Sequence, residues 1–526
     1  MKKEEQKEEQ NKKEEDQKTK DFKAPKILNT YLGQKGYTLY KKELTIEQQQ
    51  FIKKELTVKP YSPGMNQQNA KTFPAFREVD KKLYVPRYFG EQYFGKPKES
   101  KISQGDDINI EFNGELRENQ KPVVKSFLDY VNKDKTGGGL LDLPCAFGKT
   151  SLSLYLVSQL KKKTLVIVHK EFLMNQWIER IQQFLPSARI GKIQGQIIDI
   201  ENKDIVLGML QSLSMKDYPA TMFDSFGLTI IDEVHHISSE VFSCALFKLV
   251  TNYTLGLSAT MNRKDGTTHI FKLFLGDIIH KEVRGKDDAV LVRALEYESN
   301  NEEFNTVEYD YRGQAKYSTM ISKLCEFSAR TEFILRVIGD MLKENGEQQI
   351  MVIAHNKNVL KYIFDAIQHR KITTVGYYVG GMKEAALKES EGKQVIIATY
   401  SMAAEALDIK TLTTLIMVTP KTDIEQAVGR ILRAKHSMPV VVDIIDQHDP
   451  FQNQWKKRKA YYMKNNYKII QTGSSTYDAD ITKWDVIYEP GTSTRKACTR
   501  APKIKPTSEE ALQGKCLIKI KKSAEE

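Results

Sequence analysis

Short apolar runs rich in Val, Ile and Leu recur through the middle of the chain, and stretches of mixed polarity long enough for a helix separate them. A first series comprises residues 138–144, 164–169, 204–210, 228–232 and 253–259, and a second comprises residues 348–355, 373–380, 394–400, 414–420 and 439–446. Runs that are apolar on both faces are typical of parallel strands, and the stretches between them are typical of crossover helices. The pattern predicts an α/β fold with two doubly wound parallel sheets in tandem, whose ligands lie beyond the carboxyl ends of the strands.

The pattern changes at both ends of the chain and between the two series. Residues 1–25 alternate Lys and Glu with almost no apolar side chain, which predicts a disordered charged tail, with a solvated single helix as the alternative. Residues 26–105 are rich in aromatic residues and Pro, which predicts an N-terminal accessory domain. The remaining expected parts are a first sheet domain at 106–285, a linker or insertion at 286–330 with linker favoured, a second sheet domain at 331–470 and a polar C-terminal tail at 471–526.

Composition narrows the class of protein. The 526 residues are 40% apolar, enough for several cores. No apolar stretch approaches the roughly eighteen residues of a membrane span, and the N-terminus lacks the apolar core of a signal peptide, so we expect an intracellular protein without membrane contact. The five cysteines are too far apart for a Cys-x-x-Cys site, so we expect free thiols and no structural metal. The net charge of +12 mildly favours polyanion partners.

Aromatic and charged residues interleave in the segment LYVPRYFGEQYFGKP at residues 83–97. Such interleaving could stack nucleic-acid bases. The favoured interpretation is that these rings pack the accessory domain against its neighbour.

The segment LPCAFGKT at residues 143–150 follows the first predicted strand and precedes an apolar helical stretch. A phosphate-binding loop needs this context, because backbone amides at the start of a helix hold phosphate oxygens. Lys149 would place its charge against the β- and γ-phosphates of ATP, and the Thr150 hydroxyl would coordinate Mg²⁺. Ala146 stands where glycine is usual. If the backbone there has a positive φ, alanine costs about 1 kcal/mol, and we expect tuned rather than lost activity.

Two adjacent carboxylates, Asp232 and Glu233, end the predicted strand 228–232 and begin a DEVH tetrapeptide that His235 completes. Asp232 would hold the Mg²⁺ shell, and Glu233 would orient the attacking water. Alone, such a pair is often a solvated cap, but its occurrence after the phosphate-binding loop favours the catalytic interpretation.

The next predicted strand ends at Ser258 and Thr260, a small hydroxyl-bearing turn. These hydroxyls would sense the carboxylates and relay the state of the nucleotide. A plain turn is the alternative.

The second series contains the segment KTDIEQAVGRILR at residues 421–433. It predicts a helix with Asp423 as its N-cap, on which Gln426, Arg430 and Arg433 share one face. Two arginines directed at the γ-phosphate from a second domain would stabilise developing charge, an effect of roughly 10³ to 10⁵ in rate. A surface helix with ordinary salt bridges is the alternative.

The ordered set LRENQ (116–120), LPCAFGKT, VHKEFLMNQW (168–177), GMLQSL (208–213), DEVH, SAT, ATYSMAAEALD (398–408) and QAVGRILR (426–433) resembles superfamily 2 helicases over residues 115–460. The segments LVIVHKEFLMNQW and GLSATMNRKDG resemble the XPB-type branch. LYVPRYFG and VVVDIIDQHDPF resemble large-DNA-virus members of that branch, such as the poxvirus transcript-release helicases.

This resemblance implies two RecA-like domains that bind ATP and Mg²⁺ between them and move along nucleic acid. It implies a DNA-dependent ATPase, with DNA preferred to RNA and 3′ to 5′ polarity, used in transcription or repair. A partnership with transcription machinery, a monomer or transient complex, and residence in host cytoplasm or virion if the chain is viral would follow.

The resemblance also assigns roles residue by residue. Arg117 and Gln120 would contact adenine, and the remaining nucleotide contacts would come from Pro144, Cys145, Ala146, Phe147, Gly148, Lys149, Thr150, Ser151 and Asp408. The nucleic-acid groove would contain His169, Lys170, Gln211, Ser212 and Thr399, and Glu405 would join Ser258 and Thr260 in coupling. The family usually has Glu-Gly-Leu-Asp where this chain has Glu405-Ala406-Leu407-Asp408, which puts in doubt how closely that loop approaches its ligand.

Two other function classes remain open at this point. Ala146 and Ala406 are compatible with a non-hydrolysing nucleic-acid-binding scaffold that has a degenerate ATP site. The motor subunit of a nuclease is the third hypothesis, although no paired acids with a lysine stand out beyond the motor segments.

Overall fold

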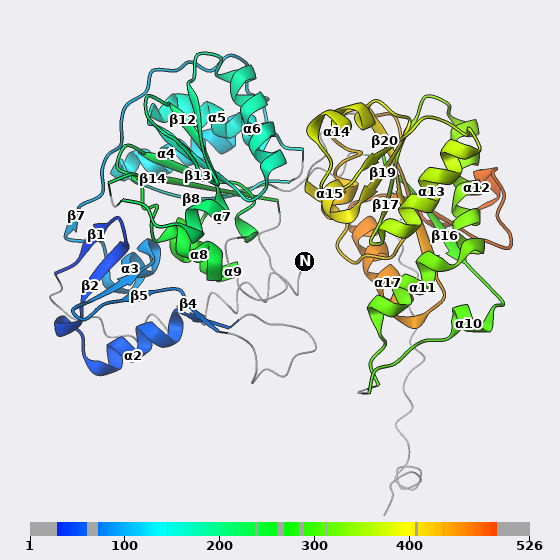
Figure 1. Ribbon diagram of the computed structural model, residues 1–526, viewed down its shortest axis with the longest axis horizontal. Coiled ribbons are helices and arrows are strands. Elements are labelled where there is room, and N and C mark those ends of the chain that lie inside the picture. The colour runs from blue at the N-terminus through cyan, green and yellow to red at the C-terminus, as the bar shows by residue number, and fades with distance from the viewer. Residues whose placement is uncertain are drawn as a thin grey trace, which may run out of the picture.

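The computed structural model describes residues 29–59, 72–144, 146–219, 221–236, 240–259, 268–282, 289–311, 313–405, 409–434 and 436–491. The charged tail expected at 1–25 lies outside these residues. Figure 1 shows two lobes, one holding the accessory part and the first large sheet, the other holding the second large sheet.

The first large sheet has eight strands in the order β11-β10-β12-β9-β13-β14-β8-β15. Its strands are β8 (Gly137–Asp142), β9 (Thr164–Val168), β10 (Ile190–Gln194), β11 (Ile197–Asp199), β12 (Ile205–Met209), β13 (Leu228–Ile231), β14 (Tyr253–Ser258) and β15 (Ile278–Lys281). Its helices are α4 (Lys121–Asp134), α5 (Lys149–Leu160), α6 (Glu171–Phe184), α7 (Leu210–Met215), α8 (Glu240–Leu246) and α9 (Thr268–Leu275). All its pairings are parallel except β10 with β11. The five predicted strands are confirmed, whereas β10, β11 and β15 near the edges lack a fully apolar run.

The second large sheet also has eight strands, in the order β18-β19-β17-β20-β21-β16-β22-β23. Its strands are β16 (Leu291–Tyr297), β17 (Gln349–Ala354), β18 (Val375–Tyr378), β19 (Val395–Thr399), β20 (Leu412–Met417), β21 (Val440–Asp446), β22 (Lys468–Gly473) and β23 (Asp485–Tyr488). Its helices are α10 (Glu302–Asn305), α11 (Tyr317–Glu326), α12 (Ser328–Glu344), α13 (Lys357–His369), α14 (Glu384–Glu391), α15 (Tyr400–Glu405), α16 (Glu425–Val428) and α17 (Asp449–Lys464). The pairings are parallel except β22 with β23, so the prediction of two tandem parallel-sheet domains is confirmed.

Two of the expected boundaries are wrong. The linker expected at 286–330 is wrong over the described residues 289–311 and 313–330, because β16 lies between β21 and β22 inside the second sheet and α11 packs into its core. The strand reads as polar because it contains Arg293, yet that residue is only 5% exposed and pairs with Glu344 at 2.6 Å. The tail expected at 471–526 is wrong over 471–491, where the rest of β22 and all of β23 extend the same sheet.

The accessory part forms a five-stranded sheet in the order β5-β6-β2-β1-β7. Its elements are β1 (Tyr31–Gly33), β2 (Gly36–Tyr40), α2 (Ile46–Glu55), β5 (Arg77–Glu78), β6 (Lys82–Val85), α3 (Arg87–Phe94) and β7 (Glu99–Ser100), beside a small pair formed by β3 (Thr57–Val58) and β4 (Phe73–Pro74). Its buried side chains and those of α8 and α9 form one continuous hydrophobic cluster. The accessory sheet therefore shares a core with the first large sheet.

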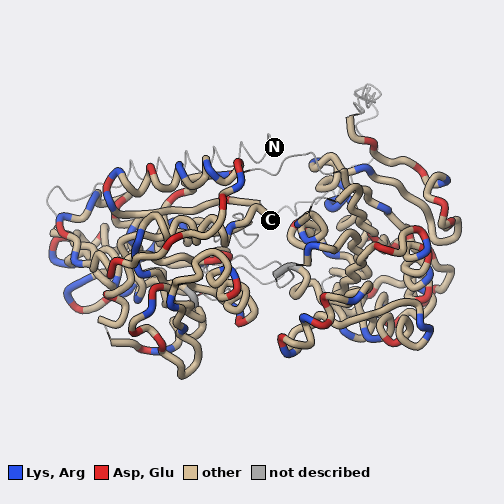
Figure 2. The backbone as a smooth tube through the Cα atoms, turned by 90° about the horizontal axis from the view of Figure 1, so that it is seen from above, with Lys and Arg blue, Asp and Glu red and all other residues tan. Residues whose placement is uncertain are grey.

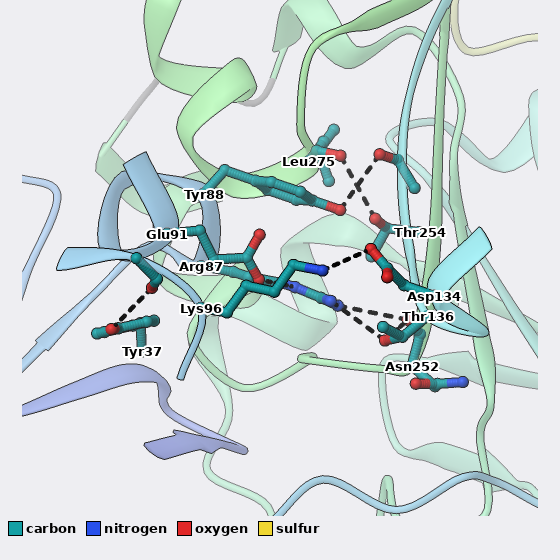
Figure 3. Close-up of polar contacts among 12 residues, drawn as sticks. Tyr37, Arg87, Tyr88, Glu91, Lys96, Asp134, Thr136, Asn252, Thr254 and Leu275 are labelled. Atoms are coloured by element: carbon teal, nitrogen blue, oxygen red, sulfur yellow. Dashed lines mark hydrogen bonds and ion pairs between the residues drawn. The ribbon is translucent and has the colours of Figure 1, made fainter. Parts of the chain in front are cut away.

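Polar contacts fasten this shared core at the amino ends of β8 and β14 (Figure 3). The Arg87 guanidinium donates to the Asn252 carbonyl at 3.3 Å and to Thr136 Oγ1 at 3.1 Å. The Tyr88 hydroxyl donates to the Gly138 carbonyl at 3.2 Å, and Phe89 beside it is 2% exposed. The packing interpretation of the aromatic segment is thus confirmed for these residues.

Candidate nucleotide and nucleic-acid site

The loop 143–148 joins β8 to α5 at the carboxyl end of a strand inside the first sheet. Two of its residues have left-handed backbone angles, Ala146 with a φ of 63° and Gly148 with a φ of 85°. Alanine in this conformation costs about 1 kcal/mol more than glycine, so the strain suggested at Ala146 is present. Lys149 is the first residue of α5, and backbone amides in the first turn of a helix favour phosphate.

The side chains of Arg117 and Gln120 contact the backbone carbonyls of this loop. The Gln120 side-chain amide donates to the Phe147 carbonyl at 2.9 Å, and its oxygen accepts the Arg117 backbone N–H at 3.0 Å. The Arg117 guanidinium donates to the carbonyls of Ala146 and Phe147. Gln120 is 2% exposed. Both side chains thus brace the phosphate-binding loop, and Gln120 would have to exchange these bonds in order to read an adenine edge.

Lys149, Asp232 and Glu233 come together at the carboxyl ends of β8 and β13. Lys149 Nζ lies 3.8 Å from Glu233 Oε1. One Asp232 oxygen accepts the Glu233 backbone N–H at 3.0 Å, and the other accepts the Trp177 indole N–H at 3.0 Å. Burial raises the pKa of Asp232 and the charge of Glu233 raises it further, while Lys149 opposes both. The arrangement places a lysine and two carboxylates around one small volume beside the loop.

His235 and Ser258 extend this cluster toward β14. His235 Nδ1 lies 3.4 Å from Glu233 Oε2 and 3.3 Å from Ser258 Oγ. Ser258 is fully buried, and its carbonyl accepts the Leu143 N–H at 3.0 Å. The end of β14 is therefore hydrogen-bonded both to the carboxylate segment and to the start of the phosphate-binding loop.

The residues expected to contact Mg²⁺ fit that ion. Thr150 lies in the first turn of α5, and Asp232 directly follows β13, which β14 separates from β8 in the sheet. Across the part of the chain that the structure describes, no three His, Cys, Asp or Glu side chains form a group able to hold a metal ion. Mg²⁺ typically takes one or two carboxylates together with substrate phosphates and water, which is the donor set available here.

Four residues expected in the nucleic-acid groove lie at the carboxyl ends of β9 and β12. The Gln211 side chain donates to the His169 carbonyl at 2.8 Å, which joins the two strand ends. Ser212 Oγ accepts the Gly195 N–H at 2.9 Å, and Lys170 is the N-cap of α6. The structure thus brings together on one edge the residues that the sequence assigned to one surface.

In the second domain, Thr399 and Gln426 line a cavity of about 370 Å³ at the carboxyl ends of β17 and β19. Its other lining residues are Ala354, His355, Tyr400, Ser401 and Lys421. Burial, and after it the charge of Lys421, lowers the pKa of His355 to about 4. Sequence reasoning missed His355 and Lys421, although His355 ends the predicted strand 348–355 and Lys421 directly follows the predicted strand 414–420.

The arginine segment differs in shape from its prediction. The N-cap of α16 is Ile424 with no side-chain cap, so Asp423 is not the N-cap. The helix ends at Val428 before Gly429, and Arg430 lies in the following turn at 8% exposure. The single helical face expected for Gln426, Arg430 and Arg433 is therefore wrong, because the helix ends at Val428 and both arginines lie beyond it. Both arginines nevertheless lie close enough to lower the pKa of Tyr378, against the larger effect of burial.

Described residues of the two domains contact each other between α6 and α14. Burial raises the pKa of Glu425 on α16, and among the charges that act on this carboxyl are two from the first domain, Asp142, which raises its pKa, and Lys149, which lowers it. Between α6 and α14, Asn175 donates to Glu384 at 2.9 Å and Lys388 pairs with Glu179 at 2.8 Å.

Some of the predicted site residues are outside the part of the chain that the structure describes. Cys145, Thr260 and Asp408 are not among the described residues, and the side chain of Glu405 is not described. Their expected roles remain predictions. No helix within the described ranges is long and apolar enough to cross a membrane.

Comparison with known proteins matches both domains. The family model "Type III restriction enzyme, res subunit" matches residues 113–263, and "Helicase conserved C-terminal domain" matches residues 331–435. The "Putative ATP-dependent RNA helicase L396" of Acanthamoeba polyphaga mimivirus is 33% identical over 456 residues, which cover 84% of this chain and 86% of that protein. The chain belongs to the superfamily 2 helicases.

Other relatives of this helicase are also proteins of large DNA viruses. The "Putative ATP-dependent RNA helicase QP509L" of African swine fever virus, strain Badajoz 1971 Vero-adapted, is 25% identical over 388 residues, 69% of this chain and 75% of that protein. The "Putative helicase 161L" of Invertebrate iridescent virus 6 is 25% identical over 420 residues, 75% of this chain and 91% of that protein. The helicase is an ATP-hydrolysing enzyme, which sets aside the scaffold hypothesis.

Proposed function

We propose that this helicase binds ATP between its two parallel-sheet domains and uses hydrolysis to move along one nucleic-acid strand. The observation that carries the proposal is the convergence of Lys149 and Glu233 at the carboxyl ends of β8 and β13, with Nζ 3.8 Å from Oε1, in a domain that contacts the second domain through α6 and α14. A nucleotide held by the loop 143–150 would then meet the arginine segment of the other domain. Closure on ATP and opening after phosphate release convert hydrolysis into relative motion.

Each polar group near the loop has a distinct part in the proposed reaction. Lys149 binds the β- and γ-phosphates, and Glu233 orients the water that attacks the γ-phosphate. Thr150 and Asp232 would hold Mg²⁺, which neutralises charge on the phosphates during transfer. Arg430 and Arg433 stabilise the same charge from the second domain. The hydrogen-bonded path from Glu233 through His235 to Ser258 would report the state of the nucleotide to β14.

The nucleic-acid strand is proposed to cross both domains. In the first domain it contacts His169, Lys170, Gln211 and Ser212. In the second domain it passes Thr399 and the 370 Å³ cavity, where Lys421 is positioned to meet a phosphate. Lys and Arg positions are interspersed with Asp and Glu along both lobes rather than gathered on one face (Figure 2). Binding therefore depends on this groove more than on the net charge, and salt weakens it through displaced phosphate contacts.

We propose DNA as the track, with 3′ to 5′ movement and a role in transcription or repair, on the motif resemblance to XPB-type helicases. The names of the relatives from mimivirus and African swine fever virus favour RNA, which is the second candidate. Phosphate release measured with DNA and RNA oligonucleotides of matched length and sequence separates the two. Displacement of streptavidin from one or the other strand end measures polarity.

The catalytic assignment is tested by nucleic-acid-stimulated phosphate release in Lys149→Ala and Glu233→Gln. Both variants should lose stimulated hydrolysis, because the first removes the phosphate charge and the second removes the water-orienting carboxylate. Lys125→Ala serves as the matched control, since Lys125 is an exposed residue of α4. Stimulated turnover at the control rate in either site variant would overturn the assignment.

A further inference from the structure

Helix α6 contacts three parts of the helicase at once. It begins at Glu171, with Lys170 as its N-cap directly after His169. Asn175 and Glu179 form polar contacts with α14 of the second domain, at 2.9 and 2.8 Å. From the same helix, the Trp177 indole donates to Asp232 Oδ2 at 3.0 Å.

The contacts with α14 and the contact with Asp232 are made by opposite sides of α6. Residues two positions apart on an α-helix differ by about 200° around its axis, so Trp177 lies opposite both Asn175 and Glu179. The helix therefore lies between the second domain and Asp232. A displacement of α14 that pulls on one side of α6 moves the indole on the other side.

The indole is well placed to fix the Asp232 carboxylate. Trp177 is 1% exposed, so water is poorly placed to replace its hydrogen bond. Each Asp232 oxygen has one protein donor, the Trp177 indole on Oδ2 and the Glu233 backbone N–H on Oδ1. Two donors on the two oxygens hold the plane of the carboxylate in one orientation.

We infer that Trp177 is a positioning residue, which orients the Asp232 carboxylate for Mg²⁺ and makes that orientation depend on contact between α6 and the second domain. The inference rests on the proposed role of Asp232 as a Mg²⁺ ligand and adds a regulator of that ligand. Groups that orient a metal-binding residue typically change metal affinity or activity by about 10- to 100-fold when they are removed.

The test is Trp177→Phe, which keeps an aromatic ring in the core and removes the N–H donor. Its readout is equilibrium binding of a fluorescent non-hydrolysable ATP analogue during Mg²⁺ titration, so no turnover is involved. The Mg²⁺ concentration for half-maximal binding should rise about tenfold. The matched control is Trp484→Phe, because Trp484 is 7% exposed and donates its indole N–H to the Asp478 carbonyl at 2.9 Å, away from the nucleotide site.

A double variant tests whether the contact between α6 and the second domain affects the orientation of Asp232. Asn175→Ala with Glu179→Ala removes the hydrogen bond to Glu384 and the ion pair with Lys388 on α14 and leaves the Trp177 indole intact. Addition of oligonucleotide should shift the Mg²⁺ midpoint in the wild-type chain and shift it at least threefold less in this double variant. An equal shift in both would overturn the coupling.

A second measurement keeps the inference testable if Trp177→Phe does not fold. The chain contains three tryptophans, so Trp455→Phe with Trp484→Phe leaves Trp177 as the sole tryptophan. Its emission should change when Mg²⁺ joins the bound nucleotide analogue, and an unchanged emission would contradict the inference. A Mg²⁺ midpoint in Trp177→Phe equal to that of Trp484→Phe would overturn it directly. An unaltered Mg²⁺ dependence in Asp232→Asn would instead refute the proposed metal ligand itself.

Discussion

A series of substitutions at Ala146 tests the strained phosphate-binding loop. With a φ of 63°, alanine is about 1 to 2 kcal/mol less favourable than glycine in the folded chain. Glycine also gains freedom in the unfolded chain, which offsets about 0.4 to 1 kcal/mol. Ala146→Gly should therefore stabilise the first domain by about 0.5 to 1 kcal/mol. Ala146→Val should destabilise it, because a β-branched residue tolerates positive φ worse than alanine does.

Thermal denaturation of the full chain without nucleotide measures the order of stability. At roughly 2 to 4 °C per kcal/mol, the midpoint of the first domain should rise by about 1 to 4 °C for glycine and fall for valine. Affinity for an ATP analogue should change little in the glycine variant if the bound loop keeps the same backbone. A glycine variant less stable than the wild type would show that this backbone does not need positive φ and would refute the reasoning.

Three further predictions address the second domain. Arg430→Ala should keep ATP binding and lose about 10³-fold or more in hydrolysis rate if the arginine meets the γ-phosphate. Arg370→Ala, at an exposed position, is the control. Equal losses of hydrolysis rate in the two variants would refute the assignment of Arg430. Arg330 and Asp446 are both fully buried and pair at 2.6 Å. Asp446→Asn leaves the arginine charge buried without its partner and should lower the free energy of unfolding by about 3 kcal/mol or more, whereas Arg330→Met with Asp446→Leu removes both charges and should lower it much less. Urea denaturation midpoints measure both variants. Because the pKa of His355 is lowered to about 4, the unfolded chain takes up a proton below about 6.5 that the folded chain refuses until about 4. Wild-type stability should thus fall from pH 6.5 to 4 more steeply than that of His355→Gln, with the neighbours Lys421 and Tyr400 unchanged; parallel pH profiles would contradict this.

Most of the central strands were predictable, because they are buried on both faces and their sequences are continuously apolar. The strand β16 was not, since Arg293 inside it is neutralised by Glu344, more than fifty residues away along the chain. No local pattern reveals such a partner. The strand β23 was missed for another reason, since it is short, none of its four residues is buried, and it pairs with β22 at the edge of the sheet.

The candidate site also contains residues that local sequence motifs predict and residues whose contacts depend on distant parts of the chain. Lys149, Asp232 and Glu233 lie in short contiguous sequence motifs, so their chemical roles could be predicted without knowledge of the fold. The bond from Trp177 to Asp232 joins residues 55 positions apart, and the cavity beside His355 forms only when several strand ends meet. The arginine helix is shorter than predicted, since it ends at Val428, directly before Gly429.

The fastening of the accessory sheet has a mechanical consequence. Arg87 and Tyr88 form hydrogen bonds at the amino ends of β8 and β14, whereas the loop 143–148 lies at the carboxyl end of β8, and a shared hydrophobic core supports these contacts. In the proposed motion the accessory sheet and the first sheet domain would therefore move as one rigid body. A probe or tether attached to the accessory sheet would report the position of the first domain, and only a second probe on the other lobe would reveal the change in distance between them.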